Sequence, residues 1–128
     1  MKLTALEREV LARSFAGNHP GLAALREQLA SAEVQSREMT GVGFFTKLAL
    51  DPNVAPVVVT SPRVAFGDVQ AEIGGLRYGA GFVVFIMNGR LDSMEGFTYG
   101  EPWPVHIDTF TLRDGPDAHR GLSELRWP

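Results

Sequence analysis

The residues of this sequence that could do chemistry are carboxylates and arginines on strand-like segments. Glu95 is the most informative of them, because it lies close to Phe97 and, across a predicted hairpin, to Phe82. A carboxylate in such apolar surroundings either pairs with a cation such as Arg37, or has a raised pKa and can serve as a general acid or base. The residue types alone leave both alternatives open.

Two further carboxylates, Asp68 and Glu72, fall on one face of a predicted strand, with Gln70 between them. A pair of carboxylates on one face can bind a cation or divide the work of a general acid and a general base. A polar stripe on the solvent side of a strand produces the same pattern, so the spacing favours a site without requiring one.

Arg37 and Glu38 precede a Gly-x-Gly segment, in which backbone amides next to Gly41 and Gly43 could hold an anion. The alternative is a strand that the glycines bend. Trp103 stands between two prolines, as an interface anchor on a stiff loop or as a lid over the edge of the core. The candidate binding residues are therefore Arg37, Glu38, Asp68, Glu72, Glu95 and Trp103.

Other chemistries find little support in the residue types. The chain has no cysteine, and its three histidines, His19, His106 and His119, lack the spacing of metal ligands. Ser93 lies in "LDSMEG", which is not the Gly-x-Ser-x-Gly context of a nucleophilic serine. We predict no catalytic residue, no metal site and no cofactor.

Length and composition bound the remaining possibilities. A chain of 128 residues with 45% hydrophobic and 21% charged residues fits one globular domain, which we assign to residues 1–128. The net charge of −3 and the lack of a basic run argue against nucleic-acid binding. The sequence shows neither a signal peptide nor a run of about 18 apolar residues, so we expect a cytoplasmic protein that does not bind membranes.

Two amphipathic helices are predicted at the N-terminal end, over about residues 4–16 and 20–32. Thr4 and Glu7 form the pattern of a capping box, and Pro20 suits the first turn of the second helix. Leu22, Leu25 and Leu29 form the apolar stripe of that helix, which leaves Gln28 on its outer side. Both stripes are narrow, so the helices should cover another layer rather than form a bundle alone.

The period of the apolar residues changes at Glu33, and strand patterns continue from there to about residue 112. Two helices followed only by strands indicate the α+β class. Because short links favour antiparallel pairing, we predict one curved antiparallel sheet of about five strands, with both helices on one face. Residues 113–128 form a polar tail.

Asn88-Gly89 is the strongest turn signal in the chain, since a type I′ hairpin turn needs positive φ at both positions. A two-residue turn without irregularity sets the register. The expected pairs are Met87 with Arg90, Ile86 with Leu91, Phe85 with Asp92, Val84 with Ser93, Val83 with Met94 and Phe82 with Glu95. This register places Glu95 on the apolar face of the hairpin.

The second face of the hairpin carries Val83, Phe85 and Met87, and it is too apolar for a fully solvated surface. Either loops or the tail cover this face, or it forms the interface of a homodimer.

Three segments, "SREMTGVGFFT", "FGDVQAEIGGLRYGAGFVVFI" and "NGRLDSMEGFTYGEPWP", resemble a family of small bacterial proteins with no assigned function. Members share an Arg-Glu-x-Thr-Gly-x-Gly-Phe-Phe-Thr segment and a Leu-Glu-Gly-Tyr-Thr-Tyr-like segment that ends in Trp-Pro. The second segment here begins with Met94, a mild departure that keeps the glutamate. The match covers roughly residues 36–104. It implies a bacterial protein and brings no activity with it.

Three functions fit these observations. The first is a non-enzymatic binding or interaction protein, as a homodimer or with another protein partner. The second is a small enzyme or ligand binder that uses a pocket of carboxylates and arginine. The third is an acidic protein that neutralises a toxin, which predicts that acidic groups cluster on one exposed surface.

Overall fold

The structure of the chain is a computed structural model, and it describes residues 1–126. The helices are α1 (Ala5–Ser14) and α2 (Pro20–Ser31), followed by a short 3-10 helix, η1 (Leu122–Glu124). The strands are β1 (Glu33–Met39), β2 (Gly43–Ala49), β3 (Val58–Val59), β4 (Arg63–Ile73), β5 (Ala80–Met87), β6 (Arg90–Thr98), β7 (Phe110–Asp114) and β8 (Leu125–Arg126). No helix in this described part of the chain is long and apolar enough to cross a membrane.

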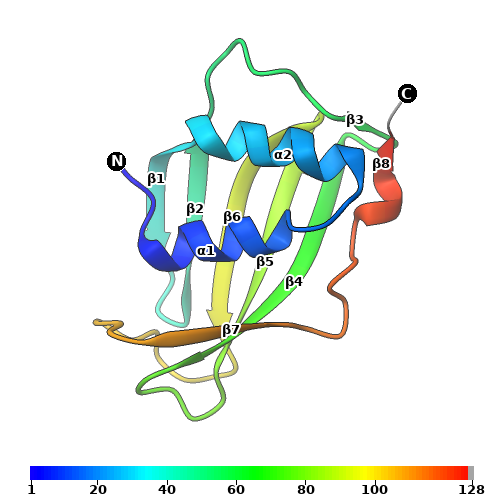
Figure 1. Cartoon of the computed structure of the whole chain (residues 1–128). Helices are drawn as coiled ribbons and strands as arrows, with labels where there is room; N and C mark the ends of the chain where they lie inside the picture. Colours follow the sequence, from blue (N-terminus) through cyan, green and yellow to red (C-terminus); the bar gives the residue numbers. More distant parts are fainter. Residues whose placement is uncertain (127–128) are drawn as a thin grey trace.

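Six strands form one antiparallel sheet in the order β1-β2-β6-β5-β4-β7, and both long helices lie on the same face of it (Figure 1). The predicted α+β class is therefore confirmed. The sheet has one strand more than expected, because residues 33–49 form two strands rather than one. Gly41 has a φ of 88°, and the Thr40 amide donates to the Gly43 carbonyl, so the chain reverses there.

Local signals set the starts of both long helices. The Thr4 hydroxyl accepts from the Glu7 amide, and the Glu7 carboxylate accepts from the Thr4 amide, which completes the predicted capping box of α1. His19 caps α2, since its Nδ1 accepts a hydrogen bond from the Gly21 amide.

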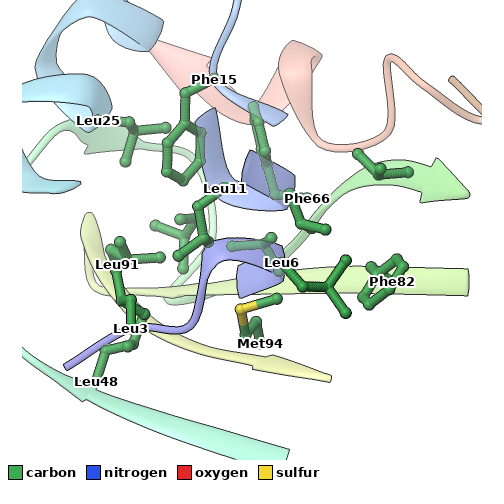
Figure 2. Close-up of a cluster of buried hydrophobic side chains, with 14 of the residues drawn as sticks. Leu3, Leu6, Leu11, Phe15, Leu25, Leu48, Phe66, Phe82, Leu91 and Met94 are labelled. Carbon is green, nitrogen blue, oxygen red and sulfur yellow. The ribbon is translucent and has the colours of Figure 1, made fainter. Parts of the chain in front are cut away.

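The hydrophobic core lies between the helices and the face of the sheet that they cover, called the inner face here. Side chains from α1, α2 and the central strands interdigitate there, as Figure 2 shows for Phe15, Leu25 and Phe66 among others. Phe15 and Phe66 pack with their ring centroids 5.8 Å apart. Burial of these side chains provides the main driving force for the fold.

Gln28 corrects the expected outer side of α2, because its side chain is completely buried. Its Nε2 donates to the carbonyls of Ala55 and Gly89, and its Oε1 accepts from the Leu91 amide. A buried amide with these three bonds joins α2 to the tip of the β5–β6 hairpin and to the loop before β3. Gln28 is thus a polar residue on the buried side of α2, where it provides hydrogen bonds to these three backbone groups.

The hairpin turn is as predicted, with φ of 51° at Asn88 and 79° at Gly89, but the register beyond it is not. Ile86 pairs with Leu91, whereas Phe85 pairs with Ser93, so Asp92 forms a β-bulge. The bulge shifts every later pair by one residue. Glu95 therefore lies opposite Val83 and is exposed, and the prediction that it faces the core beside Phe82 is wrong.

The C-terminal part is more ordered than a polar tail. The last strand of the sheet is β7, and it includes Arg113 and Asp114, the first two residues of the expected tail. Leu125 is buried and pairs with Val59 in a separate two-stranded ribbon of β3 and β8. The last two residues of the predicted tail, 127 and 128, lie outside the described part of the chain.

Candidate functional site

A pocket opens between the first turn of α1, the inner face of β1 and β2, the irregular segment 103–107 and the start of β7. Its volume is about 320 Å³, at the lower end of the range for small-molecule sites. The lining residues are Thr4, Ala5, Leu6, Glu7, Arg37, Met39, Phe44, Trp103, Pro104, Val105, Ile107 and Phe110. Most of them are apolar, and the polar ones lie on α1 and β1.

Trp103 forms the aromatic wall of the pocket. Its ring meets Phe44 nearly edge-on at 5.1 Å between centroids and Phe82 at 6.4 Å. Edge-to-face aromatic contacts of this kind add about 0.5–1.5 kcal/mol beyond the burial of area. The Trp103 amide donates to the Gly41 carbonyl at 2.8 Å, so both ring and backbone are fixed to the β1–β2 hairpin.

The segment that carries Trp103 is held at two further points. The Glu101 carboxylate accepts from the backbone amides of Arg77 and Tyr78, at 2.9 and 3.0 Å, and the Thr98 hydroxyl donates to the Glu101 carbonyl. The hydrogen bonds from these two backbone amides lower the pKa of Glu101. The segment "YGEPWP" is therefore held in place by hydrogen bonds on both sides, and this fixes the position of Trp103.

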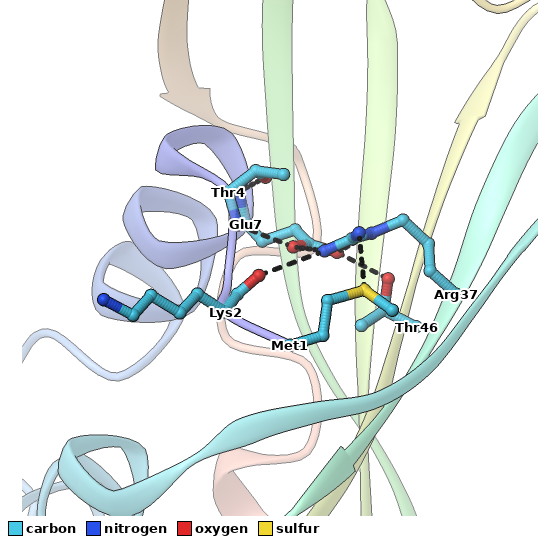
Figure 3. A network of polar contacts seen from close by, with 6 residues as sticks. All are labelled: Met1, Lys2, Thr4, Glu7, Arg37 and Thr46. Carbon is cyan, nitrogen blue, oxygen red and sulfur yellow. Dashed lines mark hydrogen bonds and ion pairs between the residues drawn. The ribbon is translucent and has the colours of Figure 1, made fainter.

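The polar wall centres on Glu7 and Arg37 (Figure 3). Arg37 Nε donates to Glu7 Oε2 at 3.0 Å, and Arg37 Nη2 donates to Glu7 Oε1 at 2.6 Å. The Thr46 hydroxyl also donates to Oε2, at 2.5 Å, and the Thr4 amide donates to Oε1. The Glu7 carboxylate thus accepts four hydrogen bonds while only 1% of the residue is exposed.

These bonds determine the ionisation of Glu7. Burial would raise its pKa, but the hydrogen bonds from Arg37, Thr46 and the Thr4 amide outweigh burial and hold the pKa below its usual value. Glu7 also raises the pKa of Arg37 through the hydrogen bonds of the pair. Both groups are charged at neutral pH, and Glu7 has neither a proton to give nor a free lone pair with which to take one.

Arg37 differs from Glu7 in having donors to spare. Its Nη1 contacts the Met1 sulfur at 3.2 Å, a weak acceptor, and its Nη2 reaches the Lys2 carbonyl at 3.5 Å. The Arg37 side chain is 22% exposed, so part of the guanidinium is open to solvent. The polar wall of the pocket can therefore offer hydrogen bonds to a ligand more readily than accept them.

Of the six residues predicted from the sequence, Arg37 and Trp103 meet in this pocket. Glu38 and Glu95 lie on the opposite face of the sheet, where Glu38 pairs with Phe45 and Phe45 pairs with Glu95. The Arg37–Glu95 pair, one of the two alternatives for Glu95, is not formed, because the bulge turns Glu95 away and Arg37 pairs with Glu7 instead.

Asp68 and Glu72 lie on β4, next to the edge strand β7, and do not form a paired site. Asp68 lies in a bulge of β4, and its carboxylate accepts from the Asp117 amide, which orders the turn after β7. Glu72 is 3.9 Å from Arg113 in an exposed ion pair. Within residues 1–126, no group of three or more acidic or histidine side chains could hold a metal ion.

The residue that sequence reasoning missed is Glu7, which was assigned only to the helix cap. A signal for its second role was present, since Glu7 falls on the apolar stripe of α1, four residues after Leu3 and three before Val10. A charged residue on a buried stripe needs a partner of opposite charge. Only the three-dimensional arrangement identifies that partner as Arg37, thirty residues away in β1.

The face of the sheet away from the helices, called the outer face, carries an apolar strip of five half-buried side chains: Phe45, Val83, Phe85, Met87 and Phe97. Charged groups border the strip. The Arg63 guanidinium lies 4.9 Å from the centroid of the Phe85 ring, and Lys47 pairs with Asp92 at 2.5 Å. Neither α1 nor α2 packs on this face.

No protein-family model, no curated protein and no solved structure matches the chain.

Proposed function

We propose that the protein binds a small, largely apolar molecule in the pocket beside Trp103, without carrying out chemistry on it. The observation that carries this proposal is the combination of a fixed aromatic wall with a polar end in one concave site. Small-molecule sites are typically apolar with a few placed polar groups. Trp103 and Phe44 provide the apolar surface, and Arg37 provides the polar contact.

Binding without catalysis is supported by the state of the titratable groups in the pocket. Glu7 has a lowered pKa and four hydrogen bonds, whereas a general acid or base must exchange a proton near neutral pH. Arg37 remains charged and cannot act as a base. The pocket contains a hydrogen-bond donor, Arg37, a carboxylate whose oxygens are already hydrogen-bonded, Glu7, and a hydrophobic surface. These features suit the binding of a ligand.

The resemblance to a family of small bacterial proteins fits the same site. The segment "SREMTGVGFFT" contributes Arg37, Met39 and Phe44 to the pocket, and "MEGFTYGEPWP" contributes Trp103 and Pro104. We propose that the chain is a member of that family and that these two segments form its binding site.

Tryptophan fluorescence tests the proposal, since Trp127→Phe leaves Trp103 as the only tryptophan of the chain. Titration with 4-phenylbutan-1-ol, a neutral probe with an aromatic end, is expected to change the Trp103 emission in a saturable way. An emission that stays constant up to the solubility limit of the probe contradicts the proposal.

Two matched substitutions locate the binding. Met39→Glu introduces a charge at an exposed residue of the pocket rim and should weaken probe binding at least about tenfold, because an apolar contact becomes charged. Val58→Glu makes the same type of change at a similarly exposed residue that does not line the pocket, and should leave binding unchanged. Equal effects of both substitutions would place the probe elsewhere.

A second function, homodimer formation through the outer face, is favoured by the apolar strip on that face. Glu95 lies within the strip, between Phe45 and Val83, whereas Glu38 lies on its β1 side and Arg63 lies beside Met87. A second copy of the chain would bury this strip against an equally apolar surface, so the partner that we propose for this face is another copy of the chain.

Analytical ultracentrifugation tests this second function, with the dimer expected at micromolar concentration. Val83→Lys should produce a monomer, because it places a charge in the strip. It should still fold, since the new ammonium lies opposite Glu95 on the neighbouring strand. A native protein that remains monomeric at a concentration of hundreds of micromolar contradicts the dimer and leaves the binding pocket unaffected.

A further inference from the structure

The polar side chains of the pocket differ in what they can offer a ligand. Glu7 accepts four hydrogen bonds already, so its oxygens have little capacity for another donor. Arg37 Nη1 has only the Met1 sulfur as a partner, and the indole N–H of Trp103 makes none of the hydrogen bonds found within residues 1–126. The Thr4 hydroxyl accepts from the Glu7 amide, and its proton is free to be donated.

The pocket therefore offers three hydrogen-bond donors that lack strong acceptors, whereas the oxygens of its one carboxylate, Glu7, already accept hydrogen bonds. This combination favours a ligand whose polar group accepts hydrogen bonds. A ligand amine would find no free side-chain acceptor and would meet the Arg37 charge. A ligand carboxylate or carbonyl would accept from these donors, and hydrogen bonds between a guanidinium and a carboxylate are stronger than neutral ones. The apolar walls formed by Phe44, Ile107 and Trp103 would hold the rest of the molecule.

Resting on the proposed binding function, we propose that the ligand is a small amphipathic carboxylic acid whose carboxylate binds Arg37 Nη1. Its apolar body lies against Trp103, and the carboxylate takes the place of the Met1 sulfur. Met1 is 67% exposed, so its side chain can move away from Arg37 with little loss of packing.

The neighbouring Glu7 weakens this preference without reversing it. Glu7 occupies the edge of the guanidinium formed by Nε and Nη2, so a carboxylate on Nη1 lies nearer to the cation than to Glu7. With separations of about 4 and 6 Å and an effective dielectric constant of about 20, attraction exceeds repulsion by roughly tenfold in affinity. An acid should therefore bind about tenfold more tightly than the matched alcohol.

Three probes with the same apolar body test the assignment on the Trp127→Phe protein: 4-phenylbutanoate, 4-phenylbutan-1-ol and 4-phenylbutylamine. The affinity is expected to be highest for the acid, about tenfold lower for the alcohol and lowest for the amine. An alcohol or amine that binds as tightly as the acid overturns the carboxylate assignment and leaves the binding function standing. Failure of all three probes contradicts the binding function itself.

Arg37→Lys locates the carboxylate contact. Lysine keeps the positive charge for Glu7 but has a single nitrogen, so the acid should lose its tenfold advantage while the alcohol binds as before. Arg113→Lys, on the exposed edge strand β7, is the matched control and should change neither affinity. An acid preference that survives Arg37→Lys, in a protein whose circular dichroism is native, places the carboxylate elsewhere.

Discussion

Glu7 in the first turn of α1 and Arg37 in β1 form a two-bond ion pair, with N–O distances of 3.0 and 2.6 Å. The pair joins the N-terminal helix to the edge strand of the sheet and forms the polar wall of the pocket. Because Glu7 is buried, removing either partner leaves the other charge in poor surroundings. The same contact therefore contributes to stability and to the shape of the candidate site.

Glu7→Gln should lower the free energy of unfolding by about 3 kcal/mol, since it removes the buried charged partner of Arg37 and disturbs the four hydrogen bonds that the carboxylate accepts. Urea unfolding of this variant, of Arg37→Gln and of the double variant measures the coupling. We expect the two effects to be non-additive by about 2 kcal/mol. Additive effects would show that the pair contributes nothing beyond the two side chains taken singly.

Because the pKa of Glu7 is lowered in the folded protein, the contribution of Glu7 to the free energy of unfolding should decrease in acid. A carboxyl group with a lower pKa in the folded state stabilises the protein fully above its unfolded pKa, and this contribution disappears as the pH falls through the folded value. The stability difference between native protein and Glu7→Gln should therefore be constant from pH 5 to 7, and shrink progressively below about pH 4.5. A difference that grows in acid would contradict the assignment.

Gln28→Leu roughly keeps the volume of the side chain and removes its two hydrogen bonds to the tip of the β5–β6 hairpin and its one to the Ala55 carbonyl. The Leu91 amide and the Ala55 carbonyl lose their partner, which should cost about 3 kcal/mol in urea unfolding. Hydrogen exchange of the Leu91 amide should also accelerate. The control is Glu27→Leu, the same replacement at the exposed neighbouring position, which is expected to change stability by less than about 0.5 kcal/mol.

Gly43 is required because β2 and β6 approach closely at its position. A Cβ added there would clash with the Gly96 carbonyl oxygen, so Gly43→Ala should destabilise the protein by about 3 kcal/mol. At Gly74 the nearest atom to an added Cβ is the Thr109 hydroxyl oxygen at 3.4 Å, and Gly74→Ala should be nearly neutral. Similar melting temperatures for both variants would contradict the close approach.

Features that depend on neighbouring residues were predictable from the sequence. The Thr4–Glu7 capping box, Pro20 in the first turn of α2 and the Asn88-Gly89 turn each involve a few adjacent positions, and all three are present. The α+β class and the placement of both helices on one face followed from the order of helix and strand patterns. Such signals are local, so no knowledge of tertiary packing was needed.

Features that depend on distant contacts were not predictable in this way. The bulge at Asp92 is one inserted residue, and alternation of side chains alone cannot place it, yet it moves Glu95 from the inner to the outer face. The Glu7–Arg37 pair joins residues thirty positions apart. Within the candidate site, sequence reasoning found Arg37 and Trp103 as separate features, and only the fold shows that they line one pocket.

The central claim, that the pocket beside Trp103 binds a small apolar acid through Arg37, is tested most directly by nuclear magnetic resonance. Isotope-labelled protein titrated with 4-phenylbutanoate should show shifts of the Trp103 indole N–H, the Arg37 Nε–H and the amides of the first turn of α1. Signals of outer-face residues such as Val83 and Phe85 should stay in place. Shifts confined to the outer face, or none at all, would contradict the account.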